Sequence, residues 1–116
     1  MTLQPYVLDR ESILVRLGGD AEIFNLMLDM YLQDYNSYCV NLDQALAGGQ
    51  APLVQREAHT VKGLLATFSD EAGTRAAYAI ETQAKQGDLA GLDTAIADLK
   101  TRLHEVATVL QAHQAA

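Results

Sequence analysis

The chain has 116 residues, of which 49% are hydrophobic and 20% charged, so it fits one globular domain and not a disordered segment. Its formal net charge of −7, with only eight Lys and Arg residues, argues against nucleic acid as a partner, because phosphate backbones attract clustered cations. No apolar run approaches the roughly 18 residues that cross a bilayer, and the single Cys39 excludes an intrachain disulfide. We expect a cytoplasmic domain without membrane insertion.

Aspartates mark the start of the first two predicted helices. Asp9 is well placed to cap a short helix that ends at about Leu17, where two glycines stop it, and Asp20 can cap the next helix. From Asp20 to Leu46, apolar residues recur at intervals of three and four, which predicts a long amphipathic helix. Its core and flank include Met27, Met30, Tyr31, Tyr35 and Tyr38.

Proline and glycine divide the rest of the chain into three further helices. "AGGQAP" ends the long helix, and Pro52 suits the first turn of a third helix, where its missing N–H would have had no partner. The Ser-Asp pair at 69–70 separates this helix from a fourth, which runs through Tyr78, Ile80 and Ala84 and which Gly87 can end in a left-handed conformation. Asp88 can cap a fifth helix.

Four helices longer than a few turns, joined by short connections, bury their apolar stripes most simply against one another. We therefore predict an all-α fold, an antiparallel four-helix bundle with a short additional N-terminal helix packed across one end. The sequence has no strand-like alternation of useful length and no internal repeat.

The third predicted helix carries a histidine on the face turned away from its apolar stripe. At about 100° per residue, His59 points roughly 140° from the centre of the stripe that runs from Val54 to Phe68. Lys62 and Gly63 lie beside it on the outer face. A glycine inside a helix costs about 1 kcal/mol relative to alanine, and the core does not need one here. We infer that something approaches the backbone closely at Gly63.

The segment "AHTVKG", residues 58–63, resembles the AHxLKG core of histidine-containing phosphotransfer (HPt) domains. "LDRESILVRLGGDAEIFNLMLDMYLQDY" is similar to the family's N-terminal segment, in which a short helix ends at a GGD-like turn before a long helix. "AAYAIETQAKQGDLAGLDTAIADLKTRL" is similar to its closing hairpin, with an AxxLE-like stretch and a GD turn. The resemblance covers about residues 8–112, and we treat residues 1–116 as a single domain of this kind.

The resemblance implies a role for each residue of the motif. His59 would be the phosphoacceptor, Lys62 would contact phosphoryl oxygens as a point charge, and Gly63 would leave room for the partner. Glu81 occupies the family's Glu or Gln position in the following helix and would orient the imidazole through a hydrogen bond; its other interpretation is an ordinary exposed glutamate. Further candidate partner contacts on this face are Gln55, Arg56 and Ala66.

The implied function is that of a phosphocarrier in a multistep two-component phosphorelay. His59 would exchange a phosphoryl group with aspartates of response-regulator receiver domains, or serve as the last relay of a hybrid sensor histidine kinase. The receiver would supply an acidic pocket and Mg²⁺, so we expect a monomer with no metal or cofactor of its own and no autonomous catalytic activity. Two alternatives stay open: a phosphorylation-incompetent scaffold that binds a receiver, and a substrate domain for a histidine kinase acting in trans.

Three positions depart from the family pattern. Leu64 and Leu65 stand where Ser and Ala are common, which predicts different packing beneath the active helix, and Ser69 stands where many members close the loop with a glycine. None of them lies on the outer face that carries His59. Sequence motifs of nucleotide, haem and di-iron sites are absent.

Overall fold

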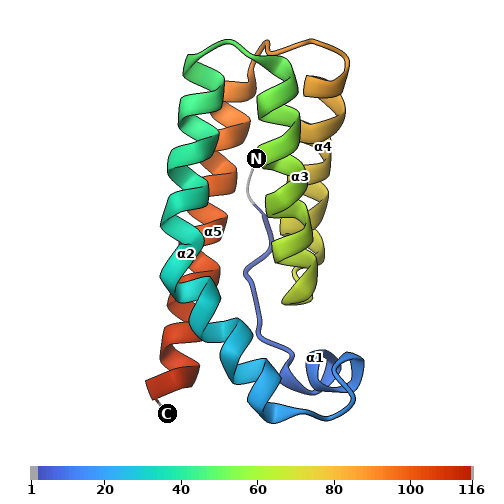
Figure 1. The fold of residues 1–116 in the computed structure, drawn as a ribbon, viewed down its shortest axis with the longest axis vertical. Coiled ribbons are helices and arrows are strands. Elements are labelled where there is room, and N and C mark those ends of the chain that lie inside the picture. The colour runs from blue at the N-terminus through green and yellow to red at the C-terminus, as the bar shows by residue number, and fades with distance from the viewer. Residues whose placement is uncertain (1–2, 116) are drawn as a thin grey trace.

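The computed structural model describes residues 3–115 and consists of helices throughout, with no strand in that range (Figure 1). The elements are α1 (Arg10–Arg16), α2 (Ala21–Ala47), α3 (Ala51–Thr67), α4 (Glu71–Lys85) and α5 (Leu92–Ala115). They form an elongated body of 41 × 24 × 24 Å. The predicted all-α class is therefore confirmed.

Three aspartates fix where helices begin. The Asp9 carboxylate accepts a hydrogen bond from the Ser12 N–H at 3.1 Å. The Asp20 carboxylate accepts hydrogen bonds from the N–H groups of residues 22 and 23, in the first turn of α2, at 3.0 and 3.1 Å. Asp70 does the same for the Gly73 N–H at 3.0 Å. Each bond satisfies an N–H that has no partner inside its own helix. In α3, Pro52 occupies the first turn instead, as predicted.

The last helix begins later than the sequence predicts. Gly87 adopts the expected left-handed conformation after α4, with φ 78°. Asp88, however, does not cap α5, because its carboxylate accepts from the Ala90 N–H at 2.9 Å and closes a short turn. The Gln83 amide donates to the Ala90 carbonyl at 2.6 Å and holds this turn against α4. The helix consequently starts at Leu92.

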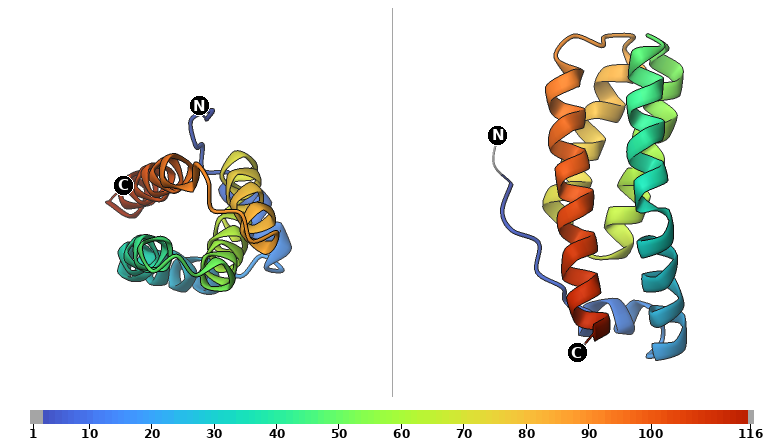
Figure 2. Two further views of the ribbon diagram at one scale, coloured as in Figure 1. Left: turned by 90° about the horizontal axis from the view of Figure 1, so that it is seen from above. Right: turned by 90° about the vertical axis from the view of Figure 1, so that its left-hand side faces the viewer.

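Helices α2 to α5 form a ring of four antiparallel neighbours, and α1 crosses one end (Figures 1 and 2). In this ring α2 packs against α3 and α5, and α4 packs against the same two helices, with the closest association between α3 and α4. The apolar stripe of α3 faces inward, with Val54, Ala58, Val61 and Leu65 all buried. This arrangement confirms the predicted four-helix bundle with an additional N-terminal helix.

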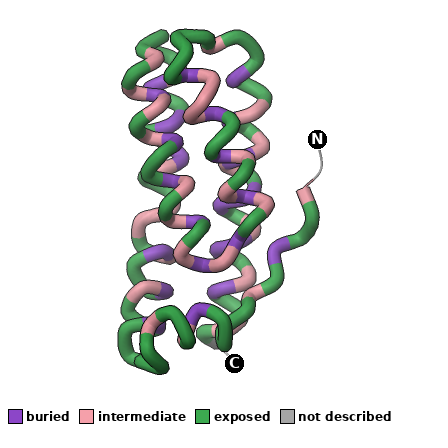
Figure 3. Tube along the Cα trace, turned by 90° about the vertical axis from the view of Figure 1, so that its right-hand side faces the viewer, coloured by how far each residue is buried: buried purple, intermediate pink, exposed green. Residues whose placement is uncertain are grey.

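An extended segment precedes α1 and lies along the bundle (Figure 3); we call residues 3–9 the N-terminal strap. Tyr6, in its middle, is buried. Its hydroxyl donates to the Phe68 carbonyl at 2.9 Å, and its N–H donates to a Glu105 carboxylate oxygen at 2.7 Å. The strap thereby ties the end of α3 to α5. The helical pattern of the sequence does not predict it, and Tyr6 precedes the segment that resembles the family, which starts at about residue 8.

One ion pair is buried where the strap, the α3–α4 turn and α5 meet. The Arg102 guanidinium donates to both carboxylate oxygens of Asp70, at 2.7 and 2.8 Å, and both side chains are almost completely enclosed. Arg102 also donates to the Gln4 carbonyl and, at 3.1 Å, to Glu105. Because a buried charge without a partner is strongly unfavourable, each member of this pair holds the other in place.

Candidate functional site

His59 lies in the middle of α3 and points away from the core. Its side chain is 66% exposed, whereas Ala58 and Val61 on the neighbouring positions are fully buried. The outward orientation that helix arithmetic predicts is therefore confirmed. The two leucines that depart from the family pattern lie away from this face: Leu65 is buried in the core, and Leu64 is half buried at the edge of the core.

The carboxylate of Glu81 joins His59 to Lys62. Glu81 comes from α4, and its side chain is only 15% exposed in the contact between α3 and α4. One of its oxygens, Oε2, lies 2.8 Å from His59 Nδ1, and the other, Oε1, lies 2.7 Å from Lys62 Nζ as an ion pair. The structure thus brings together three of the residues that the sequence selects, from two helices and 22 positions apart in the chain.

The charge of Glu81 determines which nitrogen of His59 carries a proton. Burial alone would raise the pKa of Glu81, but the hydrogen bonds and charges of Lys62 and His59 outweigh it and hold this pKa below its ordinary value. Glu81 is therefore ionised at neutral pH and can only accept hydrogen bonds. In the neutral imidazole the proton then sits on Nδ1, and Nε2 keeps its lone pair. Among the described residues, Nε2 has no hydrogen-bond partner.

Lys62 has a second neighbour that the sequence does not connect with the site. Its ammonium lies 5.0 Å from the centre of the Tyr78 ring. The sequence places Tyr78 in the fourth helix without indicating a role for it, and in the structure it is 57% exposed on the outer surface. Its position three residues before Glu81 was the available signal, because helix positions i and i+3 share a face.

Gly63 leaves an open space next to His59. A Cβ added there would meet no atom within 4 Å outside the helix itself, so nothing in the fold requires a glycine at this position. The Thr67 hydroxyl, one turn further along α3, donates to the Gly63 carbonyl at 2.9 Å. The surface at Gly63 is therefore a shallow, accessible strip of backbone.

The three peripheral candidates are not joined to His59. The Arg56 side chain is exposed, and its guanidinium nitrogen Nη2 lies 3.8 Å from Glu57 Oε1 as an ion pair. Gln55 is half buried, and Ala66 is exposed. No hydrogen bond among the described residues links these side chains to the imidazole. Their roles as partner contacts stay predictions.

The turn after α3 accommodates a serine where many family members have glycine. Ser69 has φ 59°, a left-handed conformation that an L side chain rarely adopts. Arg16 of α1 supports it: its guanidinium donates to the Ser69 hydroxyl at 2.7 Å and to the carbonyls of Ala66 and Thr67 at 3.2 and 2.9 Å. A cation at the C-terminus of α3 also suits the helix dipole. The short helix α1 therefore fixes the end of the helix that carries His59.

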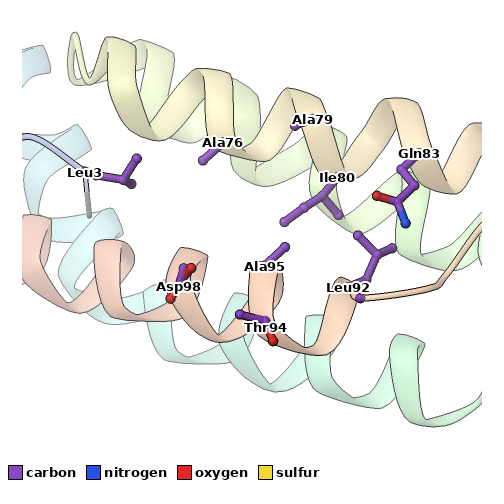
Figure 4. Close-up of a pocket in the computed structure, with 10 residues that line it drawn as sticks. Leu3, Ala76, Ala79, Ile80, Gln83, Leu92, Thr94, Ala95 and Asp98 are labelled. Carbon is purple, nitrogen blue, oxygen red and sulfur yellow. The ribbon is translucent and has the colours of Figure 1, made fainter. Parts of the chain in front are cut away.

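The bundle has one apolar hollow near the site and another away from it. A groove of about 260 Å³ between α2 and α3 is lined in part by Met30, Leu64 and Thr67, and Leu64 directly follows Gly63 in the chain. A hollow of about 340 Å³ lies between α4 and α5, where side chains such as Ile80 gather (Figure 4). The lining of the second hollow contains none of the predicted site residues.

Residues 3–115 contain no group of three His, Cys, Asp or Glu side chains arranged to hold a metal ion. Over the same range, no helix combines the length and hydrophobicity needed to cross a membrane.

Comparison with known proteins points to one family. The sequence model described as Hpt domain matches residues 26–111, which include α3 and its motif. The crystal structure of histidine-containing phosphotransfer protein B (HptB) from Pseudomonas aeruginosa PAO1 superposes with a TM-score of 0.82 at 19% identity, over 91% of this chain and 92% of that one. At this identity, the second likeness concerns the fold alone. No curated protein matches the sequence.

Proposed function

This chain belongs to the Hpt domain family, and from that membership we propose that it is a histidine phosphotransfer module of a cytoplasmic two-component phosphorelay. His59 takes a phosphoryl group from the phosphorylated aspartate of a response-regulator receiver domain and passes it to another. One observation carries the proposal: an exposed imidazole whose Nδ1 is held by an ionised carboxylate, so that Nε2 faces solvent as a nucleophile.

The transfer step needs no general base on this chain. The Nε2 lone pair attacks phosphorus, the N–P bond forms, and the P–O bond to the receiver's aspartate breaks, so that the aspartate leaves as a carboxylate with the bonding pair. Nε2 has no proton to lose. The phosphorylated ring keeps its Nδ1 proton and carries a positive charge, which Glu81 stabilises from 2.8 Å. The same step in reverse passes the group on.

The remaining requirement is neutralisation of the phosphoryl oxygens. Phosphoryl transfer passes through a loose transition state in which positioning and charge stabilisation provide most of the catalysis. Lys62, one helical turn after His59, supplies a cation on this side. The acidic pocket of the receiver, with its Mg²⁺, supplies the rest, so the chain acts as a phosphocarrier and depends on its partner for catalysis.

The surface around His59 suits a protein partner. Gly63 allows the backbone of α3 to be approached closely, and the next residue, Leu64, lines the groove between α2 and α3 together with Met30. The apolar side chains of Met30 and Leu26 on α2 are exposed. Small apolar patches beside a reactive residue are typical of transient signalling contacts. A receiver domain, free or part of a hybrid sensor histidine kinase, is the partner that this surface fits.

The test uses receiver domains labelled with radioactive acetyl phosphate. A panel of purified phosphorylated receivers is mixed with the protein, and we expect acid-labile, alkali-stable label on the wild type and none on His59→Gln. His104→Gln, on the exposed side of α5, is the matched control and should accept label normally.

Each outcome has a definite meaning. Label that persists in His59→Gln contradicts the assignment of His59. A wild type that binds receivers but accepts no label from them, or from a histidine kinase supplied with ATP, indicates a scaffold. Label accepted only from the kinase indicates a kinase substrate domain and not a relay between receivers.

A further inference from the structure

The ammonium of Lys62 is held from two sides by residues of α4. Glu81 Oε1 lies 2.7 Å from Nζ, and the centre of the Tyr78 ring lies 5.0 Å from the same atom. Tyr78 and Glu81 are three residues apart, so they project from one face of α4. The Lys62 side chain is only 25% exposed as a result, although it comes from the outer surface of α3.

These two neighbours act differently on the charge of Lys62. A carboxylate neutralises the ammonium and competes with any phosphoryl group for it. An aromatic ring attracts a cation through its quadrupole but carries no net charge, so the ammonium stays available to a second anion. A free lysine side chain also has several rotatable bonds, whose freedom is lost when it binds. A ring that already confines the ammonium removes part of that loss before the phosphoryl group arrives.

We propose that Tyr78 is a positioning residue for phosphoryl transfer: its ring face holds the Lys62 ammonium beside His59 without adding a further negative charge that would compete with phosphoryl oxygens. The inference rests on the proposed function of His59. The ring is 57% exposed, so packing of the core does not account for a large aromatic side chain at this position. Among the described residues, the Tyr78 ring is the aromatic group that contacts the Lys62 ammonium.

A small donor tests the proposal without any partner protein. Phosphoramidate transfers its phosphoryl group to Nε2 as its own P–N bond breaks and ammonia leaves, and the initial rate can be followed by ³¹P NMR. Replacing Tyr78 with Leu should slow this phosphorylation about two- to fivefold, the range expected for one cation–π contact at an exposed position. Tyr78→Phe keeps the ring and should retain the wild-type rate. In a Lys62→Met background, Tyr78→Leu should cause no further loss.

A spectroscopic measurement checks the geometry independently of transfer. The ring current of Tyr78 should shift the Lys62 Hε resonances in the wild type and in Tyr78→Phe, and the shift should disappear in Tyr78→Leu. If the wild type is not phosphorylated on His59, the proposed function fails. If the wild type is phosphorylated but Tyr78→Leu reacts equally fast, or slows equally in the Lys62→Met background, the role of Tyr78 is refuted while that of His59 stands.

Discussion

Replacing Gly63 with alanine should stabilise the protein while weakening its proposed activity. Gly63 lies inside α3, and a Cβ there would meet no atom within 4 Å, so no clash offsets the gain in helix propensity. Alanine is favoured over glycine in a helix interior by about 0.5–1 kcal/mol. For a chain of 116 residues, an unfolding entropy of about 2.1 cal/mol/K per residue converts this gain into a rise in Tm of about 2–4 °C.

Thermal and urea unfolding, followed by far-UV circular dichroism, measure this change. The matched control is Gly73→Ala in α4, where the added Cβ would overlap the Asp70 carboxylate and lie 2.9 Å from Leu65 Cδ1. Overpacking of this kind should destabilise by about 1–3 kcal/mol. A longer side chain, Gly63→Arg, should fold normally but slow transfer from a receiver by obstructing its approach. A Gly63→Ala protein less stable than the wild type, or unchanged transfer by Gly63→Arg, would refute the close-approach argument.

Two further predictions concern charged contacts. Replacing Arg102 with Met leaves the Asp70 carboxylate buried without its partner, so urea unfolding should show a loss of about 3–5 kcal/mol in the free energy of unfolding. Adding Asp70→Asn to the Arg102→Met chain should recover part of this loss, because the buried charge is removed and an asparagine can still cap α4. Glu81→Gln should lower the free energy of unfolding by about 0.5–1 kcal/mol at pH 7, as expected for a single ion pair at the edge of the solvent-accessible surface. The pKa of Glu81 is lower in the folded state, so the difference in stability between the wild type and Glu81→Gln should be complete above the ordinary pKa of 4.5 and shrink as the pH falls below it. Urea midpoints of both proteins at pH 7 and pH 3.5 measure this difference. A difference that does not change with pH contradicts the ionised contact.

Local signals in the sequence were sufficient to predict most of the fold. The capping roles of Asp9 and Asp20, the left-handed Gly87 and the apolar stripes depend on residues within a few positions of one another, and the structure agrees with each of them. The outward direction of His59 follows from the same helical period. The pairing with Glu81 was expected from family resemblance, because spacing along one helix carries no information about a residue on the next.

The features that were missed depend on context beyond a few residues. Tyr78 was not connected with the site, although its spacing from Glu81 places it on the outer face of α4. Asp88 has the chemistry of a helix cap, but its carboxylate is used by the turn before α5. The partners of the strap on α5 lie 98 and 99 positions away, and no periodic pattern reveals contacts at such separation.

The strap also has a consequence for the order in which the molecule folds. Its hydrogen bonds to α5 close a loop of nearly the whole chain, whereas α3 and α4 are adjacent in sequence and joined by a short turn. Closing the longer loop has the larger entropic cost, so we expect the α3–α4 hairpin to form early and the strap to dock onto a bundle already assembled. Among the described residues, those of the strap should therefore be the last to reach their native contacts.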